Sequence, residues 1–126
     1  MRLIAAIVGL FLAISGNLSL AADQARVTTS FDVRYTSAVL RQVAHLYTSG
    51  FGRAEADRVS QEIDRLRADQ ARTWQFQVQY QGQPETLGIH ALMDDLGMID
   101  LDFAASPVAA PKVRAAVDNY LNGRKH

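Results

Sequence analysis

The fold is decided by the stretch WQFQVQYQGQPETLGIHALMDDLGMIDLDF, which runs from Trp74 to Phe103. Apolar and polar residues alternate there in three runs, and two short sequences containing Gly with Pro or Asp separate the runs. Strict alternation is typical of half-buried strands, because successive side chains of a strand point to opposite faces of the sheet. Three such runs joined by short turns predict an antiparallel meander over residues 73–104.

The alternation gives the predicted sheet one apolar face and one polar face. Burying each large apolar side chain is worth roughly 1.5–3 kcal/mol, so we expect helices to cover the apolar face. Antiparallel sheets allow the other face to stay in water. The apolar face carries Trp74, Phe76, Val78, Tyr80, Leu87, Ile89, Ala91, Met93, Ile99, Leu101 and Phe103. The polar face carries Gln75, Gln77, Gln79, Gln81, Gly88, His90, Leu92, Asp100 and Asp102.

The segments before and after the meander predict three helices, and one of these segments has two interpretations. Residues 27–35 also alternate, and they fit either a fourth strand or the start of a helix. Apolar residues at three- and four-residue spacing predict helices over residues 38–48 and 53–71, and a third helix from Pro111 to Gly123. We therefore predict an α+β fold with a three- or four-stranded antiparallel sheet and helices packed on one face.

The N-terminus has the pattern of a secretory signal peptide. Arg2 supplies a positive charge, residues 3–14 form an apolar run, and small residues lead to Ala21. Polar residues interrupt this run before it reaches the roughly 20 residues that a membrane-spanning helix needs, so we expect cleavage rather than anchoring. The prediction is a signal peptide at 1–21 and a single small α+β domain at 22–126, exported to the periplasm or the exterior, with no stable membrane insertion after cleavage.

Composition limits the chemistry and the partners. The chain has 13 basic and 13 acidic residues, and removal of Arg2 with the signal leaves a net charge of about −1, which argues against a nucleic-acid partner. The strong preference for arginine over lysine is typical of a GC-rich bacterial genome. The absence of cysteine excludes disulfides and thiol catalysis. No phosphate-binding loop, dinucleotide fingerprint or metalloprotease motif is present, and we expect neither a cofactor nor a metal.

The strongest candidate for chemistry is His90 beside a carboxylate of the following strand. A three-residue loop between the second and third strands would pair His90 with Asp100, and a five-residue loop would pair it with Asp102. The carboxylate would favour the protonated imidazole and would orient its ring. Such a pair is half of a catalytic triad or two-thirds of a metal site, whereas a surface ion pair is the more ordinary interpretation.

These patterns favour binding over catalysis. We expect a small, exported, non-enzymatic domain that binds another macromolecule, as an adaptor, an inhibitor or an accessory subunit. Neutral glutamines suit hydrogen bonding to a protein or a glycan partner. The candidate binding residues are Gln75, Gln77, Gln79, His90, Leu92, Asp100 and Asp102. Two alternatives stay open: a carrier of a small apolar ligand between sheet and helices, and a hydrolase or metal enzyme using His90 with Asp100 or Asp102. The sequence leaves the oligomeric state open.

Overall fold

The computed structural model of the chain describes residues 24–124, so the predicted signal peptide at 1–21 and its cleavage site lie outside the described residues. In chain order the elements are β1 (Ala25–Asp32), the 3₁₀ turn η2 (Val33–Tyr35), α1 (Thr36–Ala44), α2 (Arg53–Asp64), β2 (Ala71–Tyr80), β3 (Gln83–Met93), β4 (Met98–Ala105) and α3 (Ala110–Gly123). No helix within residues 24–124 is long and apolar enough to cross a membrane.

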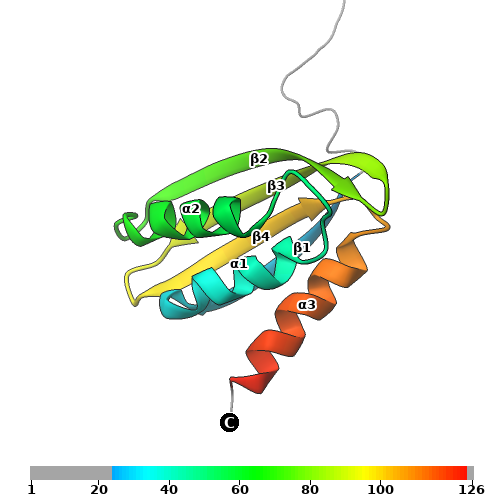
Figure 1. Ribbon diagram of the computed structural model, residues 1–126. Helices are drawn as coiled ribbons and strands as arrows, with labels where there is room; N and C mark the ends of the chain where they lie inside the picture. The colour runs from blue at the N-terminus through cyan, green and yellow to red at the C-terminus, as the bar shows by residue number, and fades with distance from the viewer. Residues whose placement is uncertain (1–23, 125–126) are drawn as a thin grey trace, which may run out of the picture.

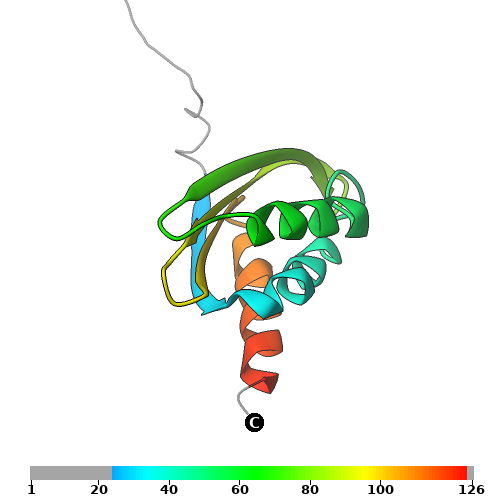
Figure 2. The same ribbon diagram turned by 90° about the vertical axis from the view of Figure 1, so that its left-hand side faces the viewer.

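The sheet has four strands in the order β1-β4-β3-β2, and each neighbouring pair is antiparallel. Strands β2, β3 and β4 form the predicted meander, and β1 adds the fourth strand at the β4 edge (Figure 1). The helices gather on one side of the curved sheet, as Figure 2 shows. The α+β prediction is therefore confirmed, and no helix within residues 24–124 covers the opposite face of the sheet (Figure 2).

The covered face of the sheet is the one that the alternation predicts to be apolar. Leu87, Ile99, Leu101 and Phe103 have no exposed surface, and the other apolar-face residues of the meander are buried with them. Each helix contributes its own buried stripe: Val39, Leu40 and Val43 in α1, Ala56, Val59 and Ile63 in α2, and Val113 and Val117 in α3. Hydrophobic burial on this one side therefore fixes which way every strand residue points.

The segment 27–35 combines both interpretations of its sequence. Strand β1 ends at Asp32, whose side chain accepts a hydrogen bond of 3.0 Å from the backbone N–H of Arg34. This bond caps the turn η2, so Val33 and Tyr35 leave the strand although they continue its alternation. A short polar side chain that bonds the backbone two residues ahead commonly ends a strand in this way.

The first helix is shorter than predicted, since α1 ends at Ala44 instead of Thr48. The chain leaves the helix to pair with the edge of β2: the Thr48 N–H donates to the Gln79 carbonyl and the Gln79 N–H donates to the Ser49 carbonyl, each at 3.0 Å. Gly50 has φ of 91°, and a Cβ there would lie 2.0 Å from the Gln77 carbonyl oxygen, so this close approach requires glycine.

The second helix is also shorter than predicted, because α2 ends at Asp64 instead of Ala71. The segment that follows pairs with the end of β3: the Asp69 N–H donates to the Met93 carbonyl at 2.7 Å, and the Met93 N–H donates to the Gln70 carbonyl at 3.0 Å. These bonds prevent the same backbone groups from continuing the helix. The chain therefore enters β2 at Ala71, three residues before the alternating run begins.

The turn between β2 and β3 lies earlier than the predicted break at residues 82–85. Only Gln81 and Gly82 separate the strands, and both have positive φ, of 51° and 81°. Two residues with positive φ are typical of the tightest hairpin turns, whose twist matches that of the strands. Gln81 is therefore a turn residue and not a member of the polar face.

Candidate functional site

The uncovered face of the sheet carries a hollow of about 330 Å³. Its floor is made by Gly88 of β3 and Ala104 of β4, which are register partners, and the row continues to Gln75 of β2 and Arg26 of β1. A row with two small central residues and two long outer side chains produces a depression in a face that would otherwise be flat. The hollow therefore follows directly from which residues the register places side by side.

Polar side chains form the rim of the hollow on both sides of that row. One neighbouring row contributes Thr73, His90 and Asp102, and the opposite side contributes Thr86 and Gln24. The Gln24 side-chain amide donates to the Thr86 carbonyl at 2.9 Å, which attaches the start of the described chain to β3. All four strands, or the residues next to them, thus supply side chains to one site.

The backbone of Gly88 does not itself require glycine. Its φ lies outside the left-handed region, and a Cβ built at this position meets only the Ala104 Cβ, at 3.4 Å. Glycine inside a strand weakens the sheet, and it is often found where a ligand or another backbone approaches closely. What glycine provides at position 88 is room on the open face.

His90 contacts β2 rather than a carboxylate. Its Nδ1 atom lies 2.8 Å from the Thr73 hydroxyl oxygen, and the described residues show no ion pair between this ring and any carboxylate. The register places His90 opposite Asp102, and Asp100 lies opposite Leu92. The five-residue alternative, counted between the register partners Met93 and Ile99, is therefore correct. The expected ion pair is not formed, and the imidazole Nδ1 is bonded to Thr73 instead.

Asp102 has hydrogen-bonding capacity that the described residues do not use. Its Oδ1 atom is buried without a hydrogen-bond partner, and its Oδ2 atom lies 4.0 Å from an Arg26 guanidinium nitrogen. A quarter of the side chain is exposed, so Oδ2 is the oxygen that remains open to the hollow. A carboxylate oxygen accepts hydrogen bonds strongly, and a donor that enters the hollow would find an acceptor here.

The seven candidate binding residues divide into two groups. Gln75, His90 and Asp102 line the hollow. The other four lie outside it: Gln77, Gln79, Leu92 and Asp100. Gln77 accepts a 3.3 Å hydrogen bond from the Thr86 hydroxyl, and the Gln79 backbone is paired with the α1–α2 loop. Sequence reasoning missed Arg26 and Ala104, although both continue the polar sides of their alternating runs.

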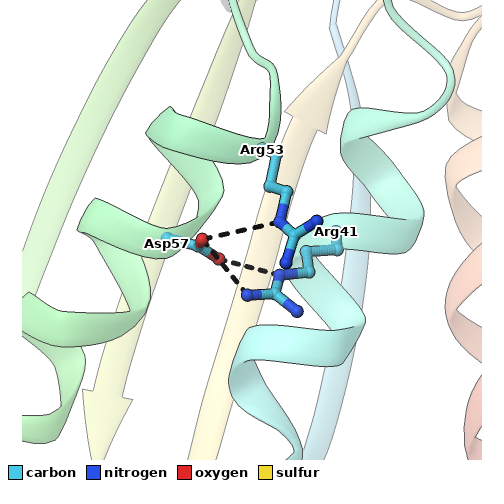
Figure 3. A network of polar contacts seen from close by, with 3 residues as sticks. All are labelled: Arg41, Arg53 and Asp57. Atoms are coloured by element: carbon cyan, nitrogen blue, oxygen red, sulfur yellow. Dashed lines mark hydrogen bonds and ion pairs between the residues drawn. The ribbon is translucent and has the colours of Figure 1, made fainter.

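The charged cluster of the molecule lies on the helical side and is structural. Asp57 of α2 accepts two hydrogen bonds from Arg41 of α1, at 2.8 and 3.1 Å, and lies 3.9 Å from Arg53 (Figure 3). The hydrogen bond from Arg41 lowers the pKa of the Asp57 carboxyl from its ordinary value. Because both Asp57 oxygens accept from the Arg41 guanidinium, this network joins the two helices.

Residues 24–124 contain no group of three His, Asp or Glu side chains that could hold a metal ion. Thr73, His90 and Asp102 do bring a hydroxyl, an imidazole and a carboxylate into one row of the sheet. The bond between ring and carboxylate that a triad requires is not formed. Comparison with known proteins found no matching family model, no matching curated protein and no matching solved structure.

Proposed function

We propose that the protein is a small exported, non-enzymatic domain that binds another macromolecule through the uncovered face of its sheet. The observation that carries the proposal is the hollow, because it is built by side chains from β1, β2, β3 and β4 on the face that no helix of residues 24–124 covers. Export rests on the signal-peptide pattern of residues 1–21. The partner is a protein or a glycan, and the role is that of an adaptor, an inhibitor or an accessory subunit.

The chemistry of the face supports binding by hydrogen bonds. Arg26 and Asp102 carry opposite charges near the hollow, and glutamines and threonines supply neutral donors and acceptors around them. A surface without a strong field of one sign selects neither a polyanion nor a small ion. The face around the hollow, with the half-buried Leu92 and the exposed Asp100, extends the contact beyond a single small molecule.

Beneath β2, aromatic side chains of the chain itself occupy the space in which an apolar ligand would lie. Phe51 is fully buried beneath the sheet, and its ring centroid lies 5.0 Å from that of Phe76. The rings of Tyr47 and Tyr80 pack edge to face, 5.8 Å apart. Side chains of the α1–α2 loop and β2 therefore fill one another's space, as expected for a close-packed core.

Site-specific photo-crosslinking in the natural host tests the proposal. A photoreactive amino acid replaces Gln75 on the hollow wall in one variant, and Gln61 on the exposed side of α2 in a matched control. We expect position 75 to give a covalent adduct of defined mass and position 61 to give none. Mass spectrometry of the adduct distinguishes a protein from a glycan. Adducts from position 61 alone, or from neither position, would refute a binding face on the sheet.

A further inference from the structure

The space above Gly88 and Ala104 on the open face is the first observation that bears on the ligand of the hollow. Gly88 occupies the middle of the inner strand β3 without a positive φ or a crowding contact that would demand it. Its register partner Ala104 is also small, whereas Gln75 and Arg26 at the ends of the same row are long. The result is a shallow floor of backbone and methyl groups with polar side chains around it, which suits a single ring lying on the sheet.

The rim chemistry is the second clue. Asp102 Oδ2 accepts hydrogen bonds, the Arg26 guanidinium donates them, and the Gln75 amide does both. The two charges are of opposite sign, so a ligand with charge of a single sign is attracted by one and repelled by the other. An apolar ligand would remove these groups from water without replacing their hydrogen bonds. A neutral ligand that carries several hydroxyl groups meets both donors and acceptors.

Size is the third clue. A volume of about 330 Å³ lies at the lower end of the roughly 300–1,000 Å³ of ligand pockets. This room suits one ring-sized unit, not an extended peptide strand with alternating side chains. The hollow opens on the sheet surface, so a chain attached to that ring can continue across the face. We propose that the hollow binds one neutral sugar ring of a glycan; this inference rests on the proposed function and names its partner class.

Titration of the purified protein with simple sugars tests the inference. The probes are the methyl glycosides of glucose, galactose, mannose and N-acetylglucosamine, and the readout is the shift of backbone amide signals in ¹H–¹⁵N NMR spectra. We expect at least one sugar to give saturable shifts that centre on Gln75, Gly88 and Ala104. Shifts centred on the helices, or none with any of the four sugars, would overturn the inference.

A variant that fills the hollow provides a sharper test. Gly88→Leu places a side chain where the ring would lie, and the ordinary backbone at Gly88 lets the strand keep its fold, which the dispersion of the NMR spectrum verifies. The matched control is Thr28→Leu, an exposed position on the same face that does not line the hollow. We expect about a tenfold or greater loss of sugar affinity for Gly88→Leu and about none for Thr28→Leu. Equal affinity in the two variants would place the sugar elsewhere.

The two proposals fail in different ways. If no sugar binds and the crosslinker at Gln75 captures a protein, the sugar inference is wrong and the binding face stands. If no sugar binds and position 75 captures nothing, both are wrong. A glycan adduct at position 75, together with loss of sugar binding in Gly88→Leu, supports both.

Discussion

Replacing Leu101 by alanine is the most direct test of how the sheet faces are assigned. Leu101 lies in β4, which is paired on both sides, and its side chain has no exposed surface. Its register partners are Ala91 in β3 and Thr29 in β1. Both neighbours are small, so they cannot move far enough to fill the space that the leucine leaves.

The expected cost follows from that burial. Removing a fully buried leucine side chain costs about 2–5 kcal/mol, the upper part of the range applying where the cavity stays open. A small domain has about 5–15 kcal/mol of stability in total, so the variant loses a large fraction of it. With a urea dependence of about 1–3 kcal/mol per molar, a loss of about 3 kcal/mol lowers the midpoint by about 1–3 M.

The assay is urea unfolding followed by the fluorescence of Trp74, the only tryptophan of the chain. Trp74 is buried, and its indole N–H donates to Glu62 at 3.0 Å, so unfolding changes its surroundings. The matched control is Gln77→Ala on the open face, where we expect a change within about 0.5 kcal/mol. Equal midpoints for Leu101→Ala and Gln77→Ala would contradict this assignment of the two faces.

Three further predictions concern the Trp74–Glu62 hydrogen bond, the pH dependence of stability and the mature N-terminus. Glu62→Ala removes the acceptor of the Trp74 indole and the 3.0 Å partner of Arg72, so the free energy of unfolding should fall by about 1–3 kcal/mol in the same urea assay. The pKa of Asp57 is lowered in the folded chain, so the carboxylate contributes stability above the unfolded pKa, and this contribution is lost as the pH falls through the folded pKa. The Asp57→Asn variant should therefore show a flatter decline of the urea midpoint below about pH 4. An unchanged pH profile would contradict this expectation. Mass spectrometry of protein recovered from the natural host should show a chain that begins at Ala22 or Asp23, whereas a chain that retains residues 3–20 would refute export by cleavage.

The faces of the sheet could be predicted from the sequence because side-chain direction in a strand is a local property. Trp74, Ile89 and Leu101 alternate with polar neighbours, and all three are buried on the same side. The same locality made the polar face predictable, and with it the positions of Gln75, His90 and Asp102. A pattern with period two needs no knowledge of distant residues, since each residue simply points opposite to the next.

Matching the two faces left two possible registers between β3 and β4, and loop geometry selected one. The Asp94 carboxylate accepts hydrogen bonds from the backbone N–H groups of Leu96 and Met98, at 2.8 and 2.9 Å. These bonds shape the turn between the register partners Met93 and Ile99, which five residues separate, and this register places His90 opposite Asp102. Both registers keep the same residues on the apolar face, so hydrophobic burial could not distinguish them.

Helix ends and the hollow were decided by contacts between segments far apart in the chain. The helical patterns continue to Thr48 and beyond Asp64, but pairing of the following residues with β2 and β3 ends both helices early. The hollow requires Arg26 of β1 to lie beside Ala104 of β4, and no window of local sequence contains both. The sequence alone determined the three strands of the meander, their two faces and the class of fold, because these follow from neighbouring residues. Only the tertiary structure decided the site, because it depends on which strands lie side by side and in which register.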